Sequence, residues 1–174
     1  MTPFILRYGS YSGILVIATL LLGALIGSAG AAVGELLGYL FMLVALSMIF
    51  IAIKSYRDQE LGGVIRFWQG VTLGIGISLV AALAYVVGWE IYLNMTDYAF
   101  MDEYAQGVLD EAAAGGASEE ALAQLRADTE LAKENYARPL YRLSITFLEI
   151  FPVGIVVTLI SAGLLRNPRL LRAG

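Results

Sequence analysis

The stretch from Leu143 to Gly163 reads LSITFLEIFPVGIVVTLISAG, and it decides the fold class of the protein. A helix rises about 1.5 Å per residue, so roughly 20 apolar residues cross the ~30 Å hydrocarbon layer of a membrane. This stretch has the required length, although it contains an acid, Glu149, and a helix-breaking residue, Pro152. We therefore predict a membrane-spanning helix here and ask what the acid and the proline do inside it.

The rest of the chain has the same apolar character. Of its 174 residues, 59% are hydrophobic and 15% are charged, whereas soluble domains are roughly 45–50% apolar and about 25% charged. Long apolar runs occur at about 11–32, 36–53, 67–92 and 141–165, without the alternation that is typical of barrel strands. These runs predict an all-α integral membrane four-helix bundle, a single membrane domain over residues 1–174.

The first run admits a second interpretation. Arg7 precedes it and the small residues Ser28–Ala32 end it, an arrangement that also fits a signal peptide and its cleavage site. The run is longer than the usual signal-peptide core of about 7–15 apolar residues, which favours a retained spanning helix.

The distribution of Lys and Arg predicts the orientation. Basic residues gather on the cytoplasmic side of a membrane protein. When both ends of the chain and the segment after the second run are placed on one side, that side collects seven of the 11 basic residues, namely Arg7, Lys54, Arg57, Arg66, Arg166, Arg169 and Arg172. We therefore expect a multi-pass protein with both termini in the cytoplasm.

The segment between the third and fourth runs, residues 93–139, is acidic. It carries ten Asp and Glu residues, and its apolar residues recur every three or four positions, which is the helical period. Gly115 and Gly116 interrupt the pattern, and Ser118 followed by Glu119 and Glu120 is typical of a helix start. We predict an extracytoplasmic helical hairpin, inserted between the third and fourth spans, with its acids on the exposed faces. A divalent-cation or basic-partner site has no ligand pattern behind it.

Two residue types are missing from the sequence, and this excludes several chemistries. The chain has no Cys and no His, so it lacks disulfides, thiol catalysis, Cys/His zinc sites and imidazole-based triads. Its formal net charge of −4 gives no reason to expect nucleic-acid binding. We identify no catalytic residue, no metal-ligand set and no cofactor-binding motif, and we expect a protein that is not an enzyme and uses no cofactor.

Small residues recur at steps of four in the apolar runs. In lipid, helices associate where small residues let their backbones approach closely. We expect these residues to pack the bundle internally, surrounded by the lipid bilayer; a homo-oligomer or a contact with another membrane protein is the alternative. The small residues are Gly23 and Gly27, Gly34 and Gly38, then Gly70, Gly74, Ser78 and Ala82, and finally Gly154, Thr158 and Ala162.

Glu149 is expected to lie at the same depth in the membrane as a tyrosine of the third run. It lies eight residues after Tyr141, about 12 Å below the outer end of its helix, and the same depth in the third run reaches Tyr85. Pro152 has no N–H, so the carbonyl of Leu148 loses its usual helical donor, and a protonated Glu149 could replace it. We expect a largely uncharged Glu149 that faces the bundle interior, because a charged acid at this depth is expensive.

Two roles for Glu149 remain open at this point. Ionisable residues inside a membrane are functional candidates, so one role is a relay in a small proton-coupled translocator. The other is a structural acid that joins the third helix to the fourth. We favour the structural role because the sequence shows no second buried charge and no polar route to the cytoplasmic end. Glu90, beside Trp89 and Tyr92, is expected to be a wetted acid at the outer rim.

The segment KSYRDQELGG, residues 54–63, is predicted to be a cytoplasmic loop. Its simplest interpretation is a topology signal in a solvated turn, and the alternative is a docking face for a cytoplasmic partner. The residues of interest are Lys54, Tyr56, Arg57 and Asp58.

Three longer strings resemble the bacterial membrane family called domain of unknown function 4199. They are LGYLFMLVALSMIFIAIKSYRD (37–58), GASEEALAQL (116–125) and PLYRLSITFLEIFPVGIVVTLISAGLLRN (139–167). The K-x-YRD and E-x-x-PVG pieces are the most telling, and they single out Lys54, Tyr56, Arg57, Asp58, Glu149, Pro152 and Gly154. The resemblance implies a bacterial inner-membrane protein with four spans and no established activity. We expect a non-enzymatic structural or partner-binding membrane component.

Overall fold

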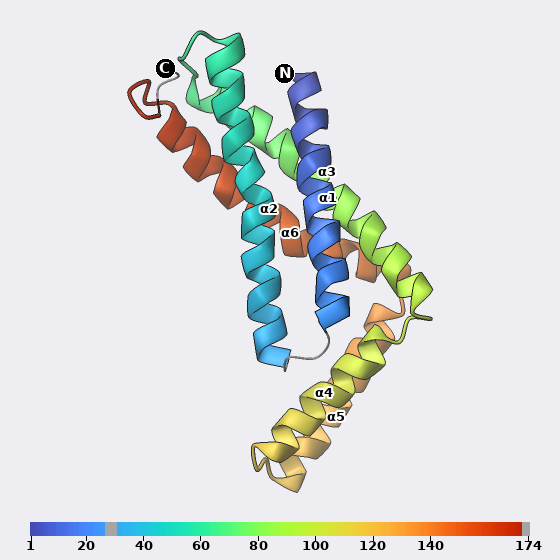
Figure 1. Ribbon diagram of the computed structural model, residues 1–174. Helices are drawn as coiled ribbons and strands as arrows, with labels where there is room; N and C mark the ends of the chain where they lie inside the picture. Colours follow the sequence, from blue (N-terminus) through green and yellow to red (C-terminus); the bar gives the residue numbers. More distant parts are fainter. Residues whose placement is uncertain (27–30, 172–174) are drawn as a thin grey trace.

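The structure is a computed structural model that describes residues 1–26 and 31–171, with side chains for 1–18 and 39–171. The described residues form six helices and contain no strand (Figure 1). The helices are α1 (Thr2–Ile26), α2 (Ala31–Glu60), α3 (Phe67–Met95), α4 (Phe100–Ala114), α5 (Glu119–Tyr136) and α6 (Pro139–Leu165).

The four long helices pack against one another, and the two shorter ones form a separate arm. Helix α3 packs against both α1 and α6, while α2 packs against α1 and α6. Helices α4 and α5 lie side by side and extend away from the rest (Figure 1). The start of α1 and the end of α6 lie at one end of the molecule, and the α4–α5 arm lies at the other.

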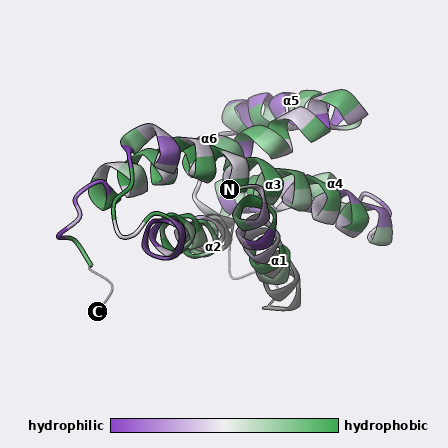
Figure 2. Ribbon diagram, turned by 90° about the horizontal axis from the view of Figure 1, so that it is seen from above, coloured by the Kyte–Doolittle hydropathy of each residue, from purple (hydrophilic) through white to green (hydrophobic). Residues whose placement is uncertain are grey.

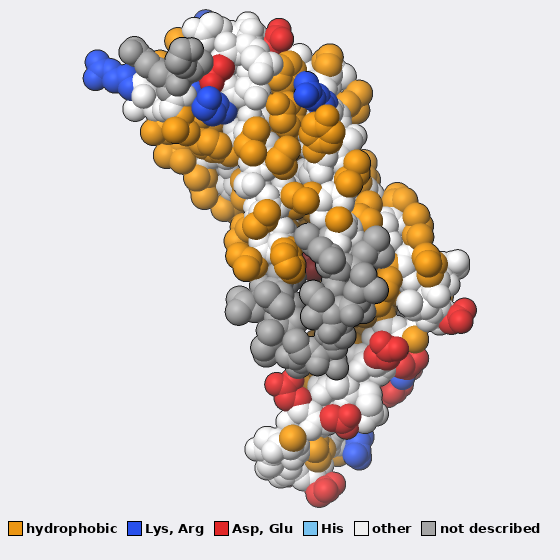
Figure 3. Space-filling model, viewed as in Figure 1, with side chains coloured by type: hydrophobic (Ala, Val, Ile, Leu, Met, Phe, Trp, Pro, Cys, Tyr) orange, Lys and Arg blue, Asp and Glu red, His pale blue; other side chains and the backbone are white. Residues whose placement is uncertain are grey.

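Three segments among the described residues are long and apolar enough to cross a membrane: Tyr39–Glu60, Phe67–Met95 and Pro139–Leu165. The remaining expected span, 11–32, is described only in part. The backbone of α1 covers Thr2–Ile26, but side chains are described only up to residue 18. The long helices consist mostly of hydrophobic residues, whereas α5 carries hydrophobic and hydrophilic residues in alternation along its length (Figure 2). Acidic side chains gather on the α4–α5 arm, at the end of the molecule opposite the N-terminus (Figure 3).

Helix α2 continues past the predicted end of the second run. It ends at Glu60, so Lys54, Tyr56, Arg57 and Asp58 lie on a helix, and the prediction of a loop at these positions is wrong. The chain contains no helix breaker until the glycine pair at 62–63, whose φ angles are 64° and 93°. Glycine takes this left-handed conformation at low cost, and it therefore terminates the helix.

Small residues bring α3 and α6 together. A Cβ atom added to Gly154 would lie 2.7 Å from Ser78 Oγ, and one added to Gly70 would lie 3.0 Å from Ala162 Cβ. The Ser78 hydroxyl donates to the Gly74 carbonyl at 2.8 Å and lies 3.4 Å from Thr158 Oγ1. The small residues of α3 and α6 therefore pack these two helices against each other within the chain. The pairs Gly23–Gly27 and Gly34–Gly38 fall outside the described side chains.

The α4–α5 arm follows its sequence pattern closely. The chain turns at Gly115 and Gly116, and the Ser118 hydroxyl accepts a hydrogen bond from the Ala121 N–H at the start of α5. Lys133 on α5 forms an ion pair with Asp102 on α4 at 2.7 Å. All ten acids of the segment are exposed.

Candidate functional site

An aromatic cluster occupies the junction between the long helices and the α4–α5 arm. Its centre is Trp89 on α3, whose ring lies 6.3 Å from Tyr85, 5.3 Å from Tyr92 and 4.8 Å from Phe100. The Trp89 indole N–H donates to the hydroxyl of Tyr136, the last residue of α5. The cluster therefore joins α3 to the beginning of α4 and the end of α5.

A buried arginine reinforces this junction. Arg142, near the start of α6, forms a two-pronged ion pair with Glu90 of α3, with Nε 2.6 Å from Oε1 and Nη2 3.0 Å from Oε2. Its Nη1 donates to the Tyr136 carbonyl at 3.0 Å, and its guanidinium carbon lies 5.0 Å from the ring centre of Tyr98. One side chain thus holds α3, α6 and the end of α5 together. Glu90, which the sequence predicts as a wetted rim acid, is 27% exposed, and the structure adds a partner that the sequence did not predict, Arg142.

The electrostatics of Tyr136 reflect its position in this junction. Burial raises the pKa of its phenol, and this effect outweighs the opposing effects of the Trp89 hydrogen bond and the Arg142 charge. A buried phenol resists ionisation because its anion would lose hydration. The Tyr136 hydroxyl therefore stays protonated and available as a donor over a wide pH range.

The structure brings Glu149 and Tyr85 together, in agreement with their matched depths. The Glu149 carboxyl interacts electrostatically with the phenols of Tyr85 and Tyr136. The Glu149 side chain is nevertheless exposed, so the prediction that it faces the bundle interior is wrong. The buried stripe of α6 runs through Thr146, Ile150 and Gly154. Glu149 lies about 100° around the helix from Ile150 and about 60° from Thr146, at the edge of that stripe.

Pro152 and Gly154 shape and pack α6 and lie outside the aromatic cluster. Pro152 is an exposed residue in the interior of the helix, where its missing N–H leaves the Leu148 carbonyl without the usual helical donor. Helix α6 bends part-way along its length (Figure 1). Gly154 is the position at which α6 approaches Ser78 of α3.

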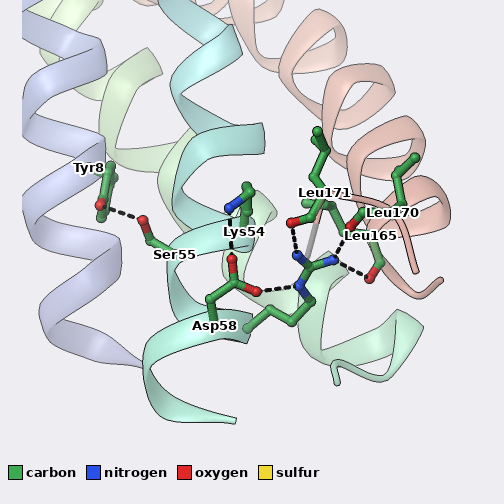
Figure 4. A network of polar contacts seen from close by, with 8 residues as sticks. Tyr8, Lys54, Ser55, Asp58, Leu165, Leu170 and Leu171 are labelled. Carbon is green, nitrogen blue, oxygen red and sulfur yellow. Dashed lines mark hydrogen bonds and ion pairs between the residues drawn. The ribbon is translucent and has the colours of Figure 1, made fainter. Parts of the chain in front are cut away.

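The K-x-YRD segment forms a second polar network, at the end of the molecule that carries the termini (Figure 4). Arg57 is 1% exposed and pairs with Asp58 through Nε and Oδ1 at 2.7 Å. Its guanidinium also donates to the carbonyls of Leu170 and Leu171, both at 2.9 Å, and contacts that of Leu165 at 3.5 Å. The sequence-based picture of a solvated turn is therefore wrong for Arg57, which ties the chain after α6 to the end of α2.

The other residues of this segment complete the network. Lys54 pairs with Asp58 at 2.8 Å, and the Tyr56 ring meets Phe4 of α1 edge-on with 5.2 Å between ring centres. Tyr8 of α1 donates to the Ser55 hydroxyl at 3.1 Å. These contacts join α1, α2 and the segment after α6, and they give the K-x-YRD residues a structural role.

A family model matches residues 7–167, which include both the K-x-YRD and the E-x-x-PVG segments. The chain belongs to the DUF4199 family. This family is described as a protein of unknown function, so membership confirms the resemblance and assigns no activity. No curated protein and no solved structure matches this chain.

The ion pair that joins α6 to α3 in this DUF4199 protein was not predicted from its sequence. Arg142 and Glu90 are 52 positions apart, and neither stands in a recognisable motif. A signal was present, since Arg142 is a charge just inside an apolar helix and lies at the same expected end of the long apolar runs as Glu90. Within the described residues, no group of three or more Asp or Glu side chains is placed to hold a metal ion.

Proposed function

We propose that this DUF4199 protein is a non-enzymatic component of the bacterial inner membrane that presents an acidic arm to a protein partner. In this proposal α1, α2, α3 and α6 cross the membrane as a four-helix bundle, both termini are cytoplasmic, and α4 and α5 form an extracytoplasmic helical hairpin. The seven basic residues at the cytoplasmic ends support this orientation.

The observation that carries the proposal is the attachment of the arm. Arg142 binds Glu90 and the Tyr136 carbonyl at once, and Trp89 bonds to the Tyr136 hydroxyl. A segment that served only as a tether between two spans would need no such clamp. A fixed arm presents its surface in one orientation, which reduces the entropic cost of binding a partner.

The chemistry of the arm points to a basic partner. Its ten acids are all exposed, and residues 93–139 contain only three basic residues, Arg126, Lys133 and Arg138. A surface of one charge sign accelerates and selects encounters with a surface of the opposite sign. We therefore infer that the partner is a protein with a basic surface on the outer side of the membrane.

The absence of cysteine from the sequence makes the topology directly testable. Gly107→Cys places a thiol on the exposed arm, where nothing lies within 4 Å of an added Cβ, and Gln59→Cys places one at the opposite end. In intact spheroplasts, a membrane-impermeant maleimide should label the first variant and not the second, while permeabilised cells should show both. Labelling of Gln59→Cys in intact spheroplasts would reverse the proposed orientation.

The partner itself can be sought by photo-crosslinking in cells. A photoreactive residue at Glu111 on the arm should give a discrete adduct, and one at lipid-facing Leu83, which is 52% exposed, should not. Amides in place of the arm's other nine acids should abolish the adduct at unchanged protein level. An adduct that survives these substitutions would show that acidity does not select the partner.

A second candidate, a small proton-coupled translocator, is favoured by the interaction of Glu149 with Tyr85. Its test is proton flux into liposomes that contain the purified protein. This candidate requires a flux that Glu149→Gln abolishes, and equal flux in both proteins would eliminate it.

A further inference from the structure

An open crevice lies beside the Glu90–Arg142 pair, where α3 and α6 meet near the arm. Its volume is about 420 Å³. The lining includes Val87, Glu90, Ile91 and Asn94 of α3, Tyr98 just after α3, and Leu143 of α6. The α3 residues are three or four positions apart, or next to one another, so they share one face of the helix. The crevice follows this face for about 10 Å, from Val87 to Asn94.

The apolar part of the crevice is suited to a lipid chain. Helices α3 and α6 are both long and apolar enough to cross a membrane. Within the crevice, Val87 is 59% exposed, Ile91 is 56% exposed and Leu143 is 37% exposed. Exposed apolar side chains on a spanning helix are covered by lipid, and a Trp such as the neighbouring Trp89 is typical of the level where acyl chains give way to headgroups.

The polar part of the crevice has unused hydrogen-bonding capacity. Each Glu90 carboxylate oxygen accepts one bond from Arg142, and a carboxylate has about four acceptor positions in all. The Glu90 side chain is 27% exposed and that of Arg142 only 7%, so a ligand meets the anionic member of the pair. Asn94, one helical turn further along, is exposed, and its side-chain amide is not bonded to another described residue.

These groups define the headgroup that would fit. The Glu90 oxygens accept hydrogen bonds and favour a cation, whereas the Asn94 amide donates as well as accepts. An anionic headgroup would face the Glu90 charge, and like charges oppose binding. A quaternary ammonium has the required charge but no N–H to donate. A primary ammonium next to a phosphate offers one group to each side chain, and Glu90 and Asn94 are neighbours on the helix, about 5–6 Å apart between Cβ atoms.

We propose that this crevice is a binding site for a phospholipid with a primary ammonium headgroup, such as phosphatidylethanolamine. The ammonium donates to the Glu90 carboxylate, the phosphate accepts from the Asn94 amide, and an acyl chain lies along Val87, Ile91 and Leu143. The lipid would thereby cover the ion pair that holds α3 to α6. This inference goes beyond the acidic-arm proposal and depends neither on a protein partner nor on the orientation in the membrane, so either one can fail while the other stands.

Native mass spectrometry of the full-length protein in detergent tests the headgroup. The delipidated protein is titrated with four lipids that share their acyl chains and carry zero to three methyl groups on the headgroup nitrogen, and with phosphatidylglycerol. We expect one tightly bound phosphatidylethanolamine, with affinity falling as N–H donors are removed. The trimethylated lipid should bind at least about tenfold more weakly, which is the effect of losing one hydrogen bond to a charged group.

Substitutions then locate the site. Asn94→Leu should weaken phosphatidylethanolamine roughly two- to tenfold, the effect of one net hydrogen bond. Val87→Trp fills the crevice and should weaken binding of the tight lipid tenfold or more. Leu83→Trp is the matched control, because Leu83 is 52% exposed one turn earlier on the same face of α3 and outside the crevice; it should match the parent. Glu90→Gln should remove the preference for the primary over the trimethylated ammonium.

The methyl series on the unaltered protein keeps the test valid even if Glu90→Gln fails to fold, and the other variants must elute as the parent does. The proposal is overturned if the parent retains no lipid, if the four methylated and unmethylated lipids bind equally, or if phosphatidylglycerol binds more tightly. Equal effects of Leu83→Trp and Val87→Trp would place the lipid elsewhere on α3. A two-chain mass that Val87→Trp dissociates would show that a second copy of the chain occupies the crevice, which also overturns the lipid site.

Discussion

Replacement of Arg142 by Met should loosen the arm and destabilise the whole chain. The Arg142 side chain is 7% exposed and that of Glu90 is 27% exposed, so the substitution leaves a mostly buried carboxylate without its partner. Loss of one member of a buried ion pair typically costs about 3–5 kcal/mol. Because Glu90 retains some contact with the surroundings, we expect the lower end, about 3 kcal/mol, including the lost bond to the Tyr136 carbonyl.

The assay is thermal unfolding of the purified protein in detergent. About 3 kcal/mol corresponds to a fall of roughly 6–12 °C in Tm for a chain of this size. Arg138→Met is the matched control, since Arg138 is an exposed arginine four residues away that makes no capping hydrogen bond to α6. Its Tm should change by about 1–2 °C at most. Hydrogen exchange should accelerate in α5 of the Arg142→Met protein.

A second variant separates the ion pair from simple loss of packing. Arg142→Met combined with Glu90→Leu removes both charges, so the stranded carboxylate is no longer present and part of the lost Tm should return. The reasoning is refuted if Arg142→Met melts with the parent, or if the double variant is less stable than Arg142→Met alone. Either result would mean that the pair does not hold the junction together.

Other substitutions test the remaining contacts by Tm and by simple spectroscopy. Arg57→Met should cost about 3–5 kcal/mol and expose the chain after α6 to trypsin, which would be contradicted by unchanged digestion. Gly154→Val should cost about 1–3 kcal/mol by forcing α6 away from Ser78, whereas Gly163→Val, where nothing lies within 4 Å, should have a smaller effect. Because burial raises the pKa of Tyr136 above its usual 10.0, the folded state holds that proton more tightly, so stability is complete below pH ~10 and falls as pH rises further. Tyr136→Phe should reduce this alkaline loss, and an unaltered pH profile would exclude Tyr136 as its source.

Much of the fold could be predicted because local patterns specify it. Apolar runs of spanning length, the break at Gly115–Gly116 and the Ser118 cap all depend on nearby residues, and each has a counterpart in the helices. The end of α2 was missed for a local reason. Its polar residues suggested a loop. The helix nevertheless continues to Glu60, just before the glycines at 62 and 63 that terminate it.

The candidate site was only partly predictable, because it depends on how helices rotate. Depth along a helix follows from counting residues, and this identified Tyr85 as the partner of Glu149. Depth does not fix the face that a residue occupies. The small-residue contact of Gly154 with Ser78 sets the rotation of α6 and leaves Glu149 exposed at the edge of the buried stripe.

The sequence by itself determined the class of the protein, its helices, the acidic arm and the family, since hydropathy, capping and helix length act over a few neighbouring residues. Only the tertiary structure decided which charges pair. Arg142 meets Glu90 across 52 positions, and Arg57 meets the Leu171 carbonyl across 114. Such pairs form where packed helices bring distant side chains together, and in a poorly hydrated interior a buried charge must find its partner there.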